Sequence, residues 1–167
     1  LFAWSYDSTG LYKSVDGGGS WQAVPDLDSS LIAAFAIDPS APNILYVGAA
    51  GGISKSTDGG ATWSLIGLSD VRSLAIDLLS PNRVYAGTAA SGLFVSTDRG
   101  ETWTELPDDD LIIDGPTVST LAIHPATPAV MYLGSNSADW CCIDGTAGFE
   151  YAQGGAIFKS MDAGITW

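Results

Sequence analysis

The sequence predicts an all-β protein assembled from repeated four-stranded antiparallel sheets, and three observations support this prediction. The 167 residues include 20 glycines and 6 tryptophans, a combination typical of short strands joined by tight turns. No segment keeps a helical period of apolar residues. An octapeptide recurs four times, beginning at Ser14, Ser56, Ser96 and Ser160. The first two intervals of about 40 residues match the blade period of a β-propeller, and the third interval contains an insertion.

The text between the octapeptides also repeats, as FAIDPSAPNILYVG, LAIDLLSPNRVYAG and LAIHPATPAVMYLG. β-branched and aromatic residues in short runs predict four strands per unit, A to D. In the first complete unit we expect these strands at Leu31–Ile37, Ile44–Gly48, Ile53–Ser56 and Thr62–Ile66. The single propeller segment 1–167 then divides into a partial blade 1–27 (strands B to D), blades 31–67 and 71–107, and a partial blade 117–167 (strands A to C).

Each position of the octapeptide has a mechanical role in a tight turn. An aspartate accepts backbone N–H bonds from its own loop, a glycine two places later supplies a positive φ, and a tryptophan restarts a strand with a large buried ring. Repetition of one residue at every blade argues for architecture rather than catalysis. The predicted structural residues are Asp16, Trp21, Asp58, Trp63, Asp98, Trp103, Asp162 and Trp167.

The octapeptides SVDGGGSW, STDGGATW, STDRGETW and SMDAGITW resemble the Asp-box, or BNR, repeat. This repeat occurs in sialidases, sortilin-type receptor domains, two-propeller xyloglucanases and photosystem II assembly factors, and the surrounding text is most similar to the xyloglucanase and assembly-factor style. The resemblance implies a β-propeller. It does not fix a function, because these families share the blade and differ in chemistry.

The predicted blades are too few for an ordinary closed ring of roughly four to eight. Both ends of the sequence offer strands B and C, so they do not complete one another. Open strand edges invite pairing. We expect further blades of the same polypeptide or, as the less favoured alternative, self-association that completes the ring.

Strand alternation predicts two edges of the propeller with different sequences. The A–B turns and the octapeptides share one edge and are nearly uniform. The D–A links and B–C turns share the other edge, and they vary from blade to blade, with one B–C loop enlarged at 135–154. Because function is usually carried by loops on a rigid frame, the variable edge is where we expect a ligand.

The insertion 135–154 combines aromatic rings with carboxylates, which suits sugar binding. The same residues also suit a loop that packs on itself. The candidate ligand-binding residues are Asp139, Trp140, Asp144, Phe149, Glu150 and Tyr151.

Cys141 and Cys142 are adjacent, about 3.8 Å apart at Cα, which is short for a disulfide. A bond between them would be strained but would stiffen the loop. The alternatives are that each thiol pairs with a part of the molecule beyond this sequence or with another chain, or that the pair is reduced and buried. We prefer an oxidising, exported location, outside the cell, in the periplasm or at the cell surface.

Acidic residues cluster in one D–A link, at Asp108, Asp109, Asp110 and Asp114. Carboxylates of this density can hold calcium, although the spacing matches no calcium loop. A solvated loop is the commoner outcome, so calcium is the minor alternative and no other cofactor is expected. His124 stands where Asp38 and Asp77 stand in the other units, which predicts a turn residue rather than a base.

The net charge of −13, from 6 basic and 19 acidic residues, disfavours nucleic acid as a partner, and no apolar run is long enough for membrane insertion. Sialidase activity is disfavoured because Arg72, Arg83 and Arg99 are not expected to converge.

We therefore predict a non-catalytic, exported scaffold that presents its variable edge to a glycan or protein partner. One alternative is a fragment of a xyloglucanase-like hydrolase, with Asp144 and Glu150 as candidate acids. The other is an assembly factor that docks onto a protein complex.

Overall fold

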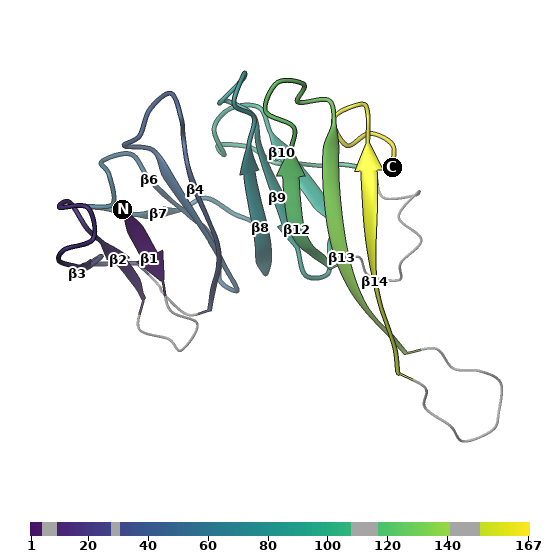
Figure 1. The fold of residues 1–167 in the computed structure, drawn as a ribbon, viewed down its shortest axis with the longest axis horizontal. Helices are drawn as coiled ribbons and strands as arrows, with labels where there is room; N and C mark the ends of the chain where they lie inside the picture. Colours follow the sequence, from purple (N-terminus) through teal and green to yellow (C-terminus); the bar gives the residue numbers. More distant parts are fainter. Residues whose placement is uncertain (5–9, 28–30, 108–116, 141–150) are drawn as a thin grey trace.

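The computed structural model describes residues 1–4, 10–27, 31–107, 117–140 and 151–167, with the backbone alone at 136–140 and 151–155. Within these residues the chain is all-β, and four antiparallel sheets follow one another from the N-terminal to the C-terminal end (Figure 1). None of the described segments is a helix with the length and apolar character needed to cross a membrane. The fold is therefore that of consecutive propeller blades.

The two middle sheets are complete meanders of four strands. The second sheet contains β4 (Ile32–Ile37), β5 (Leu45–Ala49), β6 (Gly52–Ser56) and β7 (Ser64–Leu65), and the third contains β8 (Val71–Ile76), β9 (Val84–Thr88), β10 (Leu93–Ser96) and β11 (Thr104–Glu105). The first sheet has β1 (Phe2–Trp4), β2 (Leu11–Lys13) and β3 (Gln22–Ala23). The fourth has β12 (Val118–Ile123), β13 (Met131–Trp140) and β14 (Tyr151–Ser160).

The last strand of each complete sheet is shorter than its sequence predicts. We expected a strand over 62–66 in the second sheet, but β7 covers only Ser64–Leu65. The reason is local, because the amide of Thr62 donates to the carboxylate of Asp58 at 2.9 Å and so belongs to the turn. The strand therefore begins after Thr62, at Ser64.

The insertion differs from the enlarged loop that the sequence suggested. Strands β13 and β14 pair without interruption from Met131↔Ser160 to Trp140↔Tyr151, so much of 135–154 is a two-stranded ribbon. The ribbon extends beyond the neighbouring strands (Figure 1). A ladder satisfies the backbone N–H and C=O groups of a long insertion, which an irregular loop leaves to water or side chains.

Glycines in the second strands of the two complete sheets, β5 and β9, allow each of these sheets to approach the next one closely. A Cβ at Gly48 would lie 2.6 Å from Cγ1 of Val71 in the next sheet, and one at Gly87 would lie 2.3 Å from Cγ1 of Val118. Both valines are fully buried. Tyr46 and Ile53 of the second sheet share a core with Val84 of the third, so the hydrophobic core lies between blades as well as within them.

The carboxylate of each octapeptide aspartate holds its turn together by accepting three or four hydrogen bonds. In the second sheet, Oδ1 of Asp58 accepts from the Ser56 hydroxyl at 2.8 Å and from two turn amides at 2.9 Å, while Oδ2 accepts from the Thr62 hydroxyl at 2.6 Å. The Ser56 hydroxyl oxygen accepts in turn from the amide of Gly60 at 2.8 Å. Three of these bonds recur at Asp16, Asp98 and Asp162: one from the serine hydroxyl two residues earlier, and two from the amide and the hydroxyl of the residue four positions later.

These bonds stabilise the charged form of the carboxylates. The Thr102 hydroxyl lowers the pKa of Asp98 to about 2, with help from the Thr102 amide and the Ser96 hydroxyl. The equivalent hydroxyl of Thr166 lowers the pKa of Asp162 to about 2, and the pKa values of Asp16 and Asp58 are also lowered by their own hydroxyl partners. The turns are therefore held by ionised groups at neutral pH.

The Asp-box turns of the second, third and fourth sheets also pack against the sheet before them. The hydroxyl of the fully buried Tyr46 donates to the carbonyl of Arg99 at 3.0 Å, and burial raises the pKa of this tyrosine to about 12. A Cβ at Gly100, which has a φ of 87°, would lie 2.7 Å from Cδ1 of Ile66. One sheet earlier, the Lys13 ammonium donates to the carbonyl of Gly59 at 2.7 Å.

An ion pair with a buried carboxylate adds to this contact between the second and third sheets. The Nε atom of Arg99 lies 3.2 Å from a carboxylate oxygen of the buried Asp38. Burial alone would raise the pKa of Asp38, but hydrogen bonds from Ser40 and Ala41 and the charge of Arg99 outweigh it and lower the pKa.

The structure confirms the expected role of His124. Its Nδ1 accepts from the amide of Thr127 at 3.1 Å, just as the Asp38 carboxylate accepts from the amides of Ser40 and Ala41. The imidazole therefore replaces a carboxylate as a turn acceptor.

Replacing Gly87 with alanine should destabilise the protein, because the new methyl group meets Val118 Cγ1 and the Ser73 hydroxyl at less than van der Waals distance. Overpacking of this kind costs about 1 to 3 kcal/mol. Urea unfolding measures the loss. In the double variant Gly87→Ala/Val118→Ala, the loss of unfolding free energy should be smaller than the sum of the losses in the two single variants. A loss equal to that sum would contradict close packing of the sheets as the cause.

The octapeptide carboxylates predict an acid dependence with a defined sign. Their pKa values are lower in the folded state than the ordinary value near 3.8, so their contribution is complete above about pH 4 and is lost as the pH falls towards 2. Asp98→Asn should lower the urea midpoint at neutral pH and weaken its fall between pH 4 and 2. The exposed Glu105→Gln is the control, and equal pH profiles for Asp98→Asn and wild type would contradict the assignment.

Candidate functional site

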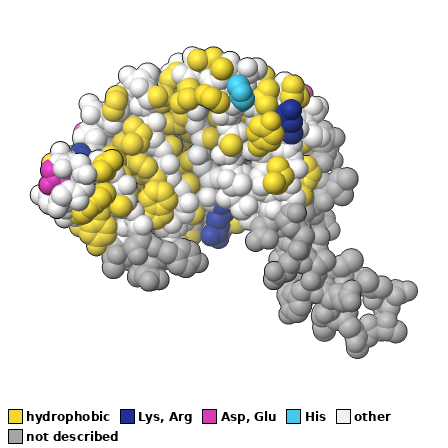
Figure 2. All heavy atoms as spheres, in the orientation of Figure 1, with side chains coloured by type: hydrophobic (Ala, Val, Ile, Leu, Met, Phe, Trp, Pro, Cys, Tyr) yellow, Lys and Arg dark blue, Asp and Glu magenta, His cyan; other side chains and the backbone are white. Residues whose placement is uncertain are grey.

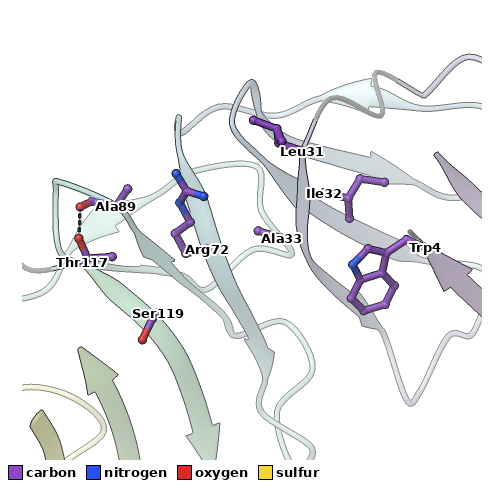
Figure 3. A pocket seen from close by; sticks show the side chains of 8 residues that line it. All are labelled: Trp4, Leu31, Ile32, Ala33, Arg72, Ala89, Thr117 and Ser119. Carbon is purple, nitrogen blue, oxygen red and sulfur yellow. Dashed lines mark hydrogen bonds between the residues drawn. The ribbon is translucent and has the colours of Figure 1, made fainter. Parts of the chain in front are cut away.

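A pocket of about 580 Å³ lies where the first strands of three successive sheets begin. These starting points belong to the edge of the D–A links and B–C turns, which is the edge with the variable sequences. The side chains around it come from all four sheets (Figure 3). The lining residues are Trp4, Leu31, Ile32, Ala33, Arg72, Ala89, Thr117 and Ser119.

Equivalent positions of the repeat supply different side chains to this pocket. Ala33, Arg72 and Ser119 are each the second residue of a first strand, in β4, β8 and β12. The first residue of each of these strands is buried instead and packs in the core. These residues are Ile32, Val71 and Val118. The repeat thus places a methyl group, a guanidinium and a hydroxyl at equivalent positions around the pocket.

Trp4 occupies the position at which the other blades have glycine. The register pairs Trp4 with Leu11 in the first sheet, whereas Gly48 pairs with Ile53 and Gly87 with Leu93. Those glycines let β5 pack against β8 and β9 against β12, whereas β1 makes no comparable contact with β4 in the described residues. Trp4 remains 44% exposed, with its ring 6.2 Å from that of Phe35. The first two sheets therefore leave room beside an accessible indole.

Arg72 is the cation of the pocket lining. Its Nη2 lies 3.7 Å from Oδ1 of Asp70, and both side chains are about half exposed, so the pair is weak and leaves the guanidinium available to a ligand. The rim is held more firmly by backbone bonds. Thr117 donates its hydroxyl to the carbonyl of Ala89 at 2.6 Å (Figure 3), and the Ala89 amide donates to the Asp70 carbonyl at 2.9 Å.

The described lining offers several kinds of group that can bind a ligand. It combines one aromatic face, one guanidinium and two hydroxyl side chains with aliphatic groups, and none of these lining residues is a carboxylic acid. A glycosidase needs two carboxyl groups on either side of the scissile bond. In the part of the chain that the structure describes, His, Cys, Asp and Glu do not form a group of three suited to a metal ion.

Most of the sequence-predicted site residues belong to the insertion. Asp139 and Trp140 end β13 and Tyr151 begins β14, with Trp140 and Tyr151 directly paired across the ribbon. The structure describes only the backbone of these three residues. Asp144, Phe149, Glu150, Cys141 and Cys142, and the acidic residues Asp108, Asp109, Asp110 and Asp114, lie outside the described residues.

The pocket lies on the predicted edge, but its residues were not those chosen from the sequence. Trp4, Thr117 and Ser119 were missed, and Arg72 was considered only as a member of a sialidase cluster. Arg99 pairs with Asp38 after the end of β4, away from Arg72 at the start of β8. An alignment of the repeats could have identified two of these pocket residues, since Trp4 stands where the other repeats have glycine and Arg72 stands where they have alanine or serine.

The fold and the turns define the class of protein. The family model of the BNR/Asp-box repeat matches residues 55–65 and 94–105. The chain is a β-propeller segment built of Asp-box blades, as the sequence predicted.

Similar proteins include enzymes and a peptide-binding propeller. A probable oligoxyloglucan-reducing end-specific xyloglucanase from Neosartorya fischeri is 28% identical over 103 residues, 61% of this chain and 11% of the relative. An ancestral GH74 enzyme of known structure is 25% identical with a TM-score of 0.73, covering 96% of this chain and 21% of the other. YCF48 bound to D1 peptide is 18% identical with a TM-score of 0.61, covering 95% and 45%. The chain thus spans a small part of the enzymes that it resembles.

Proposed function

We propose that this propeller segment is a non-catalytic binding element that acts outside the cytoplasm and takes a glycan or an extended protein segment at its variable edge. The pocket between Trp4 and Arg72 carries the proposal. Its frame is fixed by backbone hydrogen bonds, so little ordering is needed when a ligand binds.

The lining favours a glycan as the ligand. An exposed indole can cover the apolar face of a sugar ring, and the Arg72 guanidinium can donate to sugar oxygens. The hydroxyls of Thr117 and Ser119 donate to the carbonyls of Ala89 and Gly134, so their oxygens can accept from sugar hydroxyls. The relative named as a xyloglucanase makes xyloglucan oligosaccharides the first probes to use. The neighbour bound to a peptide makes an extended peptide the second class of probe.

Trp4→Ala should weaken the binding of xyloglucan oligosaccharides to the 167-residue chain by about tenfold or more, a loss of about 1.4 kcal/mol, because the ring that covers the apolar face of the sugar is removed. Isothermal titration calorimetry measures the affinity. Trp21→Ala is a matched control, since Trp21 is 42% exposed and does not line the pocket.

Two outcomes of this experiment would count against a glycan site at Trp4. Wild type that binds no oligosaccharide would reject glycans of this class, and binding of an extended peptide instead would favour the role of an assembly factor. Equal affinities for Trp4→Ala and wild type would place the glycan elsewhere.

A polysaccharide hydrolase fragment is the second candidate function. It is supported by the similarity to a xyloglucanase and to a GH74 enzyme. Asp144 and Glu150 of the insertion are the candidate acids.

Asp144→Asn or Glu150→Gln should abolish the release of reducing sugars from xyloglucan if the hydrolase function is correct, and each variant should still bind the polysaccharide. A reducing-end assay with the 167-residue chain tests this expectation. The exposed Glu105→Gln is the control. Turnover that survives in both variants would contradict the assignment of these acids, and lack of turnover in wild type would favour the binding function.

A further inference from the structure

A second cavity, of about 200 Å³, lies at the junction of the first and second sheets. Its walls come from the link after β3 and from β5, β6, β7 and the segments between them. That link and the turn before β6 belong to the variable edge. Hydrophobic side chains reach the surface in several places on the face that Figure 2 shows, so apolar exposure alone does not mark a site. This cavity is more specific, because its lining includes Asp26, Ala49, Gly52, Ser54, Trp63 and Leu65.

The link residue Asp26 has an apolar counterpart at the next junction, Leu68. Both have a positive φ, of 54° and 50°, and both follow by two residues an amide that donates to the neighbouring strand. Leu68 packs against the core between the second and third sheets, as does Trp103. Asp26 is exposed, and it shares the cavity lining with Trp63, the counterpart of Trp103. In the described part of the chain, the Asp26 carboxylate forms no ion pair.

A second difference between the two junctions makes room for the cavity. Ser54 pairs with Leu65 and Phe94 pairs with Glu105, so the serine and the phenylalanine stand at equivalent positions of β6 and β10. A hydroxymethyl group fills much less space than a phenyl ring. The junction of the first two sheets therefore combines a small side chain at Ser54 with a carboxylate at Asp26, and both residues are specific to this junction.

The lining matches a cationic side chain. Asp26 supplies a carboxylate, which can pair with an ammonium or a guanidinium group. Trp63 lies in the same lining, and tryptophan is the aromatic residue that binds cations best. Leu65, which is 69% exposed, and Ala49 offer an apolar wall to the hydrocarbon stem of a lysine or arginine. The net charge of −13 also attracts a cationic ligand.

The size of the cavity favours a single side chain over a chain of sugar rings. Its volume of about 200 Å³ is below the range of about 300 to 1,000 Å³ that is typical of pockets for drug-sized ligands. Ala49 of this lining pairs with Ile32, which lines the pocket between Trp4 and Arg72. The two cavities therefore border one pair of strand residues. An extended peptide that crosses this edge can place one of its side chains in the smaller cavity.

We infer that the cavity at Asp26 binds the lysine or arginine side chain of an extended, basic protein segment. The cationic group pairs with the Asp26 carboxylate beside the Trp63 indole, and the stem of the side chain lies along Leu65. This site is separate from the pocket between Trp4 and Arg72. The inference therefore does not depend on the ligand of that pocket.

An NMR titration of the 167-residue chain with a short basic peptide tests the inference. The probe is a capped pentapeptide of glycine with a central lysine, and the matched probe carries Nε-acetyllysine, which has no charge. We expect the lysine peptide to shift the amide signal of Gly52 and the indole signal of Trp63. It should bind about fivefold more tightly than the acetyllysine peptide, and this difference should shrink as salt is added.

Two variants assign the binding to this cavity. Asp26→Asn should weaken binding of the lysine peptide by about fivefold, and asparagine adopts a positive φ readily, so the fold is kept. Asp26→Leu should abolish binding, because it restores the apolar link of the next junction, where Leu68 has a similar φ. Glu105→Gln is the control, since Glu105 is an exposed acid outside the lining. The spectrum of each variant verifies its fold.

Several results would overturn the inference. These are equal affinities for the lysine and acetyllysine peptides, an Asp26→Asn variant that binds like wild type, and unchanged Gly52 and Trp63 signals at millimolar peptide. A glucosamine oligosaccharide that shifts the same signals more strongly than the peptide would also overturn it, because the cation would then belong to a sugar.

Discussion

The ionised aspartate of the Asp-box turn is the group on which the rest of the structure depends. Its two oxygens accept bonds from the turn amides and from the hydroxyls of flanking serine and threonine residues. Bonds to a charged acceptor contribute more than bonds between neutral groups. They hold two successive residues of the turn at positive φ, including the non-glycine residues Arg99 and Ala163. In this conformation the turn presents a carbonyl and a bare glycine to the sheet before it.

The packing of the sheets follows from that turn. Gly100 has no side chain and so leaves space for Ile66. The carbonyl of Arg99 accepts from the hydroxyl of Tyr46, which would otherwise be buried without a partner. At the other end of the blade, Gly48 and Gly87 admit Val71 and Val118. Each sheet is thus coupled to its neighbours alone, as in other repeat proteins. Since the Asp-box turns occupy one edge and the valine contacts are buried, the exposed positions of the other edge are free to vary, and the pocket is formed there.

The sequence predicted the blades well because each repeat carries its own turn chemistry. The position of Asp58 and Gly60 within STDGGATW defines a turn without knowledge of the rest of the chain. The start of β7 was misplaced because Thr62 is recruited by the aspartate, which a propensity for strands does not include. The insertion was expected to be a loop because its polar and small residues carry no clear alternation, whereas the ladder from β13 to β14 satisfies its backbone.

The pocket could not be found from motifs because it is formed by differences between repeats. Trp4 matters because it occupies in the first sheet the position that Gly48 occupies in the second. This equivalence is seen in the pairing of each strand with its neighbour, Trp4 with Leu11 and Gly48 with Ile53. Arg72 matters because β8 brings it beside Ser119 of β12, forty-seven positions later in the sequence. An Asp-box pattern identifies what the blades share, and a ligand site depends on what they do not share.

Native-state hydrogen exchange of four equivalent glycine amides tests the central claim most directly. The amides of Gly18, Gly60, Gly100 and Gly164 all donate to a serine hydroxyl at 2.7 to 2.9 Å. The last three are buried against the preceding sheet, whereas Gly18 has no described sheet before it. In the 167-residue chain, the amides of Gly60, Gly100 and Gly164 should exchange far more slowly than the amide of Gly18. Equal rates at all four glycines would show that the turn protects itself and would contradict its role in joining the sheets.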